Sequence, residues 1–165
     1  ERMIKVEERL AKLEERMIRL EESLKLTRIE LGGLANTLSY AFENEAYKML
    51  PKVLEERYSI RLKNKFIRTE IGGKEINFFA EANIDGKEVL IVGEAKMKIE
   101  SRIEKLKKER GEADVFEELE EKARAVLSKY EGKEIVKIIV THYADREFLK
   151  DAEARKILVI QSYEW

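Results

Sequence analysis

The first 31 residues repeat apolar side chains at alternating spacings of three and four, the pattern of a helix that pairs with another helix along a narrow stripe. The stripe comprises Met3, Val6, Leu10, Leu13, Met17, Leu20, Leu24, Thr27 and Leu31. With Met3 at heptad position a, arginines occupy position g and glutamates position e: Arg2, Arg9 and Arg16, and Glu7, Glu14 and Glu21. A parallel pair sets each such arginine against a glutamate, whereas an antiparallel pair opposes like charges. The pattern therefore predicts a parallel coiled-coil homodimer over residues 1–31; the alternative is that the stripe packs on the chain's own globular domain.

Gly32-Gly33 follows the stripe and predicts a break in the helix, which would separate the coiled coil from a domain over residues 32–165. An amphipathic helix is expected from residue 34 to 50, and a further turn from Pro51, since proline is tolerated at a first helical position. The apolar face of this helix is taken to comprise Leu38, Phe42, Ala46 and Met49. On that face Glu45 would point inward and Glu43 toward solvent.

The rest of the chain alternates between strand and helix patterns. Three strands are expected at residues 59–70, 74–83 and 87–96, separated by Gly72-Gly73 and the hairpin signal Asp85-Gly86. A helix at 115–130, a buried strand at 135–140, a helix at 145–154 and a strand at 157–160 follow. The late strand-helix-strand unit predicts parallel pairing. The predicted fold class is α/β, in the order α-β-β-β-α-β-α-β, with a mixed central sheet flanked by helices.

The third expected strand ends in charged residues. After Val89-Leu90-Ile91-Val92 comes Gly93-Glu94-Ala95-Lys96, and side chains two apart on a strand share a face. Glu94 and Lys96 would therefore stand side by side, where a divalent metal and a phosphate could meet. Antiparallel pairing about Asp85-Gly86 brings Asn77 close to Glu94, with Glu75 on the same face as Asn77.

This arrangement resembles the PD-(D/E)XK, or restriction-endonuclease-like, nuclease superfamily, in particular archaeal members with an N-terminal coiled coil, over residues 32–162. The resemblance implies a restriction-endonuclease-like core that acts on DNA. It also implies Mg²⁺ or Mn²⁺ held by Glu94, the side-chain oxygen of Asn77 and the carbonyl of Ala95. Lys96 would orient the attacking water or stabilise negative charge.

Two further acidic residues are candidates for this site. Glu45 would be the acid that many nucleases of this superfamily contribute from their first helix. Glu75 does not match the superfamily motif, but from the same face as Asn77 it would supply a negative charge as a further metal ligand. Asn77 departs from the superfamily pattern, which has aspartate at this position. An amide offers a neutral oxygen where a hard cation prefers a carboxylate. The bland alternative is that Glu94 and Lys96 form an ion pair at the sheet rim.

Composition places limits on partners and compartment. A chain of 165 residues without cysteine fits one domain plus an appendage in the cytoplasm, and no apolar run is long enough to span a membrane. Abundant Glu, Lys and Arg would suit a thermophile. Because the net charge is −1, DNA binding would need a local basic patch. The candidates are Lys105, Lys107, Lys108 and Arg110, within a flexible loop; neighbouring glutamates allow an ordinary solvated surface instead.

Two functional hypotheses follow. The first is a metal-dependent endodeoxyribonuclease acting as a coiled-coil dimer. The second is a catalytically inactive nuclease-fold interaction or scaffold protein, in which Asn77 marks lost metal binding. His142, the only histidine, follows the buried strand and is either a site residue or a hydrogen-bonded structural residue.

Overall fold

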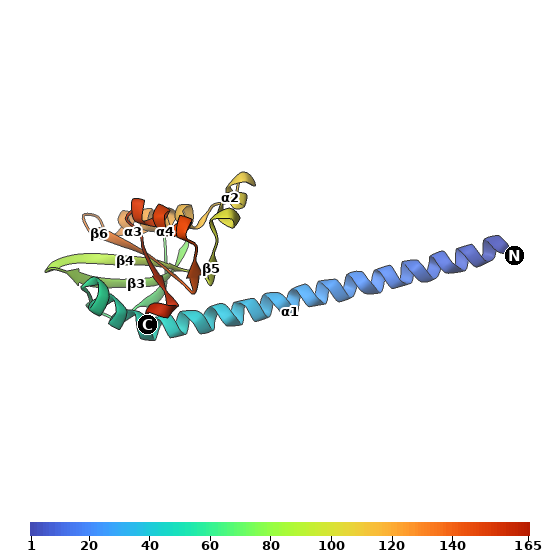
Figure 1. Ribbon diagram of the computed structural model, residues 1–165, viewed down its shortest axis with the longest axis horizontal. Helices are drawn as coiled ribbons and strands as arrows, with labels where there is room; N and C mark the ends of the chain where they lie inside the picture. Colours follow the sequence, from blue (N-terminus) through green and yellow to red (C-terminus); the bar gives the residue numbers. More distant parts are fainter. The chain divides into compact units, whose positions relative to one another are not determined.

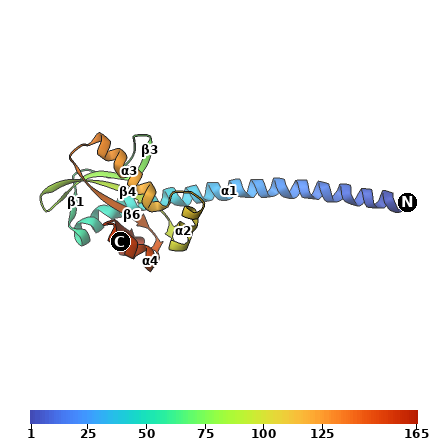
Figure 2. The ribbon, with the colours of Figure 1, turned by 90° about the horizontal axis from the view of Figure 1, so that it is seen from above.

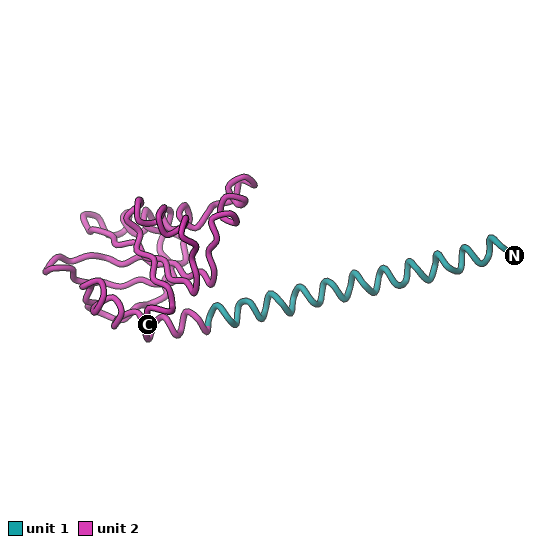
Figure 3. The backbone as a smooth tube through the Cα atoms, in the orientation of Figure 1, with its two compact units in different colours: residues 1–40 teal, residues 41–165 magenta.

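The computed structural model describes residues 1–165 and divides into two compact units, residues 1–40 and residues 41–165 (Figure 3). Helix α1 (Arg2–Tyr58) contributes to both units. The first unit consists of this helix alone, whereas the second contains all the strands and the remaining helices.

The apolar stripe of the first unit is open to solvent. Between 53% and 77% of each large apolar residue of the predicted heptads is exposed. The same spacing continues to Leu34 and Leu38, which are 56% and 47% exposed. We call the series from Met3 to Leu38 the heptad stripe. Exposed apolar surface of this extent marks an interaction site in soluble proteins. The parallel dimer stays a prediction, but the helix that it requires is present.

The predicted helix breaks at Gly32-Gly33 and before Pro51 are wrong, because α1 is continuous through both. A Cβ atom added to either glycine would meet no atom within 4 Å, and both residues fall at outer heptad positions, b and c. Glycine weakens a helix by about 1 kcal/mol relative to alanine but does not by itself end one. Pro51 removes one backbone hydrogen bond. Buried Leu50, Val53 and Leu54 hold the helix on both sides of it.

The second unit is built on a mixed sheet. Its strands are β1 (Ile60–Leu62), β2 (Ile67–Ile71), β3 (Lys74–Ile84), β4 (Lys87–Ala95), β6 (Glu134–Thr141) and β8 (Leu158–Gln161). Their order is β1-β3-β4-β6-β8, with β2 also paired to β3. The pairs β1–β3, β2–β3 and β3–β4 are antiparallel, whereas β4–β6 and β6–β8 are parallel. The predicted meander and parallel crossover are confirmed, but the predicted strand 59–70 is two short strands.

The β3–β4 hairpin turns at Asp85-Gly86, as expected. Both residues have positive φ, 51° and 83°, and the strands pair up to Ile84 and Lys87. A two-residue loop with positive φ at both positions matches the right-handed twist of the strands that it joins. This turn fixes the register of β3 against β4, and therefore which residues meet at the other end of the hairpin.

Helices cover both faces of the sheet. Helices α3 (Val115–Lys129) and α4 (Arg146–Ala154) lie on one face, and the end of α1 lies on the other (Figures 1 and 2). The predicted helices 115–130 and 145–154 are thereby confirmed. The charged stretch from 98 to 112, whose basic cluster at 105–110 was expected to lie in a flexible loop, contains β5 (Lys98–Ile99) and helix α2 (Ser101–Glu109). Strand β5 pairs in parallel with β7 (Tyr143–Ala144), and the 3₁₀ helix η1 spans Ser162–Glu164.

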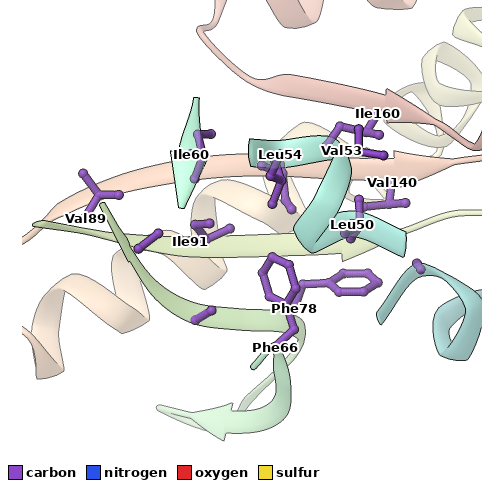
Figure 4. Packing of buried hydrophobic residues seen from close by; sticks show 14 of the residues in the cluster. Leu50, Val53, Leu54, Ile60, Phe66, Phe78, Val89, Ile91, Val140 and Ile160 are labelled. Atoms are coloured by element: carbon purple, nitrogen blue, oxygen red, sulfur yellow. The ribbon is translucent and has the colours of Figure 1, made fainter. Parts of the chain in front are cut away.

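Alternation along β4 supplies both layers of the core. Val89 and Ile91 pack with Leu50 and Leu54 of α1, in the layer shown in Figure 4. Leu90 and Val92 pack with residues of α3 and α4 on the opposite face, among them Leu119, Val126 and Phe148. Strand β6, expected to be buried on both faces, is so only in its second half, Ile138–Thr141. The two layers confirm an α/β fold with a mixed sheet flanked by helices.

Candidate functional site

Strand β4 changes from apolar to charged residues on the face that α3 covers. Leu90 and Val92 belong to the core layer under α3, so the alternation of the strand places Glu94 on the same side. Gly93 precedes it in a narrow place: an added Cβ would lie 2.6 Å from Ile138 Cγ1 and 2.9 Å from Phe78 Cβ. Glycine at this position therefore lets β4 stay close to both neighbouring strands. Glu94 itself is only 6% exposed.

Glu94 forms a buried ion pair with Lys122 of α3. Lys122 Nζ donates to Glu94 Oε2, and the two side chains are 15% and 7% exposed. Sequence analysis did not identify Lys122. Its signal is weak but present: Lys122 follows Leu119 by three residues on the predicted helix, so it borders the apolar stripe that faces the sheet.

Lys96 joins the same group of charges. Its Nζ lies 4.0 Å from Glu94 Oε1 and 3.0 Å from Oε2 of Glu118, which precedes Lys122 by one helical turn. We call Glu94, Lys96, Glu118 and Lys122 the β4–α3 ion-pair network. Glu94 and Lys96 share a face of the chain, as predicted. Their charges are balanced by α3, so the ion-pair alternative describes their contacts.

Burial shapes the acid–base properties of the network. Loss of hydration is the largest influence on Glu94 and raises its pKa, although the hydrogen bond from Lys122 and the charges of both lysines act in the opposite direction. For Lys96, burial acts to lower the pKa, but the hydrogen bond and charge of Glu118 raise it overall. Glu94 is thus a carboxylate held in a poorly hydrated position by nearby ammonium groups.

Asn77 lies next to the end of β4, as predicted, but its side chain binds the backbone. Its Oδ1 accepts a hydrogen bond from the Ala95 N–H at 3.1 Å, and the residue is 9% exposed. Tyr47 of α1 donates its hydroxyl to the Asn77 carbonyl oxygen. The bond from Ala95 continues the β3–β4 pairing beyond its last backbone partners, Phe78 and Gly93, and the bond from Tyr47 ties α1 to β3. The Asn77 amide therefore has a structural role.

A bulge in β3 gives Asn77 this position. The β2–β3 register runs from Thr69 opposite Ile76 to Ile67 opposite Phe79, two steps on β2 against three on β3. Asn77 and Phe78 thus share the place opposite Arg68. Residues three apart on a regular strand face opposite sides of the sheet. Ile76 and Phe79 are three apart but both belong to the core layer under α3, as the extra residue of the bulge requires.

The buried acid of α1 is Glu43, not Glu45. Glu43 is 7% exposed and pairs with Arg68, whereas Glu45 is exposed and accepts a hydrogen bond from Trp165 Nε1 at 3.3 Å. The expected inward orientation of Glu45 was wrong because the apolar face was estimated from residues 38 to 49 alone. Buried Leu50, Val53 and Leu54 extend this face and move its centre away from Glu45 and toward Glu43.

Glu75 is not brought to Glu94. It lies 3.4 Å from Arg68 NH1, and its side chain is 63% exposed. Arg68 therefore connects Glu43 and Glu75, separately from the β4–α3 ion-pair network.

The donor set does not fit a divalent metal. The chain contains no group of three or more His, Cys, Asp or Glu side chains placed to hold an ion. Both oxygens of Glu94 face lysines, and Glu118, the other carboxylate of the network, is paired with Lys96. Mg²⁺ and Mn²⁺ prefer several oxygen ligands with carboxylates among them. The oxygen of Asn77 is neutral and already accepts a hydrogen bond.

The predicted basic patch is a helix whose lysines are paired with acids. Lys105 lies 2.5 Å from Glu147, and Lys107 lies 3.0 Å from Glu104. Lys108 lies 3.2 Å from Asp114 and 3.5 Å from Glu117. Arg110 is the exposed C-terminal cap of α2. The flexible loop that was expected is therefore absent, and the surface around these residues is of mixed charge.

His142 has structural contacts. Its Nδ1 lies 2.7 Å from Ser162 Oγ, and its ring centroid lies 4.1 Å from that of Phe42. Gln161, the last residue of β8, accepts a hydrogen bond from the Ala144 N–H at 3.0 Å. These contacts favour the structural interpretation of His142.

No protein-family model and no curated protein matches this chain at a significant level. Among solved structures, the chain is similar to an XisH family protein from Nostoc punctiforme, with a TM-score of 0.41 and 14% identity. The match covers 72% of this chain and 93% of that protein. None of the helices has the apolar length that a bilayer crossing requires.

Proposed function

We propose that this protein is a catalytically inactive interaction module with a nuclease-like α/β fold, assembled as a homodimer through the heptad stripe. The observation that carries the proposal is the hydrogen bond from the Ala95 N–H to Asn77 Oδ1. It uses the side chain at the motif position as a structural link between β3 and β4.

The charges around this link support the same conclusion. Glu94 and Glu118 are compensated by Lys122 and Lys96, and Glu43 by Arg68. A hydrolytic site needs a group that can bind or activate a water molecule or a phosphate. A network in which every buried charge has a side-chain partner favours a fixed structure over such chemistry.

The heptad stripe supports the assembly. Its apolar residues are exposed in the single chain, and the arginines at g and glutamates at e complement one another in a parallel pair. A parallel dimer would present two copies of the α/β unit from one end of a common stalk. That arrangement suits bivalent binding or scaffolding.

A second candidate function is metal-dependent hydrolysis of DNA with Mg²⁺ or Mn²⁺. The observation that favours it is the meeting of Glu94, Lys96 and Asn77 at the end of one hairpin, in the order that the nuclease superfamily uses. It requires Glu94 to leave Lys122 and requires a ligand beyond those that now lie beside it.

A cleavage assay separates the two functions. The parent protein and Lys96→Ala are incubated with linear, nicked and single-stranded DNA in Mg²⁺ and in Mn²⁺. We expect no cleavage above that of Lys96→Ala, because the parent lacks a metal centre. Metal-dependent cleavage by the parent that disappears in Lys96→Ala and in chelator would establish the second function and overturn the first.

A further inference from the structure

We infer that Lys122 is a built-in cation that takes the place of a divalent metal beside Glu94. The inference deepens the proposed function and rests on it. In the nuclease pattern an exchangeable metal ion compensates the charge of this carboxylate, whereas here one residue of α3 would compensate it. This explains how Glu94 can be buried without a metal.

The geometry places a cation at each oxygen of Glu94. Lys122 Nζ donates to Oε2, and Lys96 Nζ lies 4.0 Å from Oε1. Both lysines lie on the side of β4 that faces α3. Lys122 is the more buried of the two, at 15% exposure of its side chain against 32% for Lys96.

Burial makes one of these cations necessary. A carboxylate that is removed from water is strongly destabilising unless an opposite charge and hydrogen bonds compensate it. In a metal site the ion supplies that compensation, and its occupancy depends on metal concentration. A lysine on the adjacent helix supplies it at all metal concentrations, because the charge is covalently attached.

The same ammonium group would oppose a metal. A divalent ion bound to Glu94 Oε2 would lie within a few ångströms of Lys122 Nζ, and the two positive charges would repel each other in a poorly hydrated place. Restoring the motif aspartate at position 77 while keeping Lys122 therefore supplies a ligand without removing the competing cation. Removal of Lys122 should therefore strengthen metal binding by a protein that carries aspartate at position 77.

Four proteins test this inference: the parent, Asn77→Asp, Lys122→Met and the double variant Asn77→Asp/Lys122→Met. Melting temperature and calorimetric binding are measured with Mn²⁺ and with chelator. We expect no metal-dependent shift in the parent and a small one in Asn77→Asp. The double variant should bind Mn²⁺ about tenfold more tightly than Asn77→Asp and show the largest rise in melting temperature. Lys122→Met alone should melt below the parent.

Lys137→Met is the matched control. Lys137 is also a partly buried lysine, at 22% exposure, and it pairs with Glu120 of the same helix α3. The double variant Asn77→Asp/Lys137→Met should respond to Mn²⁺ no more than Asn77→Asp. Should a Lys122→Met protein fail to fold, Lys122→Gln keeps a polar side chain at this position and replaces it in both variants.

The outcomes distinguish this inference from the proposed function. If Asn77→Asp binds Mn²⁺ as tightly as the folded double variant, Lys122 does not exclude the metal and the inference is wrong. The same holds if the folded double variant does not bind Mn²⁺. If the parent itself binds Mn²⁺ and cleaves DNA, the proposed function fails, whatever the effect of Lys122.

Discussion

Asn77 and Ala95 are joined by a 3.1 Å hydrogen bond in which the side-chain oxygen of Asn77 accepts the backbone N–H of Ala95. This bond links β3 to β4 at the point where the backbone ladder between them ends. It accounts for an amide at a position where the nuclease pattern has a carboxylate, because an amide performs this task without adding a second negative charge beside Glu94.

Replacing Asn77 by alanine should lower the free energy of unfolding by about 1–3 kcal/mol, the cost of leaving a part-buried donor without a partner. Chemical denaturation with urea measures the change. Asn64→Ala is the matched control, because Asn64 Oδ1 also accepts a backbone N–H, that of Glu81 at 3.0 Å, in an exposed place. The control should lose clearly less stability. Equal losses would mean that the Asn77 bond contributes no more to the free energy of unfolding than the exposed bond of Asn64.

The raised pKa of Glu94 predicts a pH dependence of stability. A carboxyl group whose pKa is higher in the folded state binds its proton more tightly there than in the unfolded chain. The free energy of unfolding should therefore fall as the pH rises from 4.5, the ordinary pKa of a glutamate, through the raised pKa of Glu94. Relative to Glu94→Gln, the parent should therefore lose free energy of unfolding over that window. Carbon-13 NMR of the Glu94 carboxyl should show a titration midpoint above 4.5. A midpoint below that value would mean that the lysines outweigh the loss of hydration.

Local patterns predicted most of the second unit. Asp85-Gly86 specified the hairpin because its two residues accept positive φ, and the hairpin register then placed Asn77 beside the end of β4. The spacing of apolar residues located α3 and α4 to within a residue. These features depend on neighbouring residues in the sequence, so the sequence alone contains the information for them.

The errors in the candidate site have a different origin. The pairing of Lys122 with Glu94 joins residues 28 apart, and no local rule connects them. The choice of Glu45 over Glu43 depended on where one amphipathic pattern of α1 stops and the next begins. Residues such as Leu38 fit both patterns. Which face is buried was decided by contacts with the sheet, which a single helical wheel does not contain.

The heptad stripe predicts that Leu20→Lys disrupts the dimer. A lysine at this core position removes apolar contact and sets two positive charges against each other in a parallel pair. The molar mass from light scattering should fall toward that of the 19.4 kDa chain, with the strand signal in circular dichroism unchanged. Ile18→Lys is the control, since Ile18 is similarly exposed, at 56%, but lies at an outer position. A monomeric parent, or equal effects of both variants, would exclude the stripe as the interface.

The continuity of α1 predicts that the stripe extends through Gly32-Gly33 to Leu38. If both glycines are helical at outer heptad positions, Gly32→Ala and Gly33→Ala should each stabilise the helix by about 1 kcal/mol per chain, because alanine has the higher helix propensity. The melting temperature of the dimer should rise, and it should fall in Leu38→Lys, which alters the stripe beyond the glycines. If α1 instead bends or breaks at Gly32-Gly33, both alanine substitutions should lower the melting temperature, because alanine disfavours the backbone conformation of a bend. Leu38→Lys should then leave the association of residues 1–31 unchanged.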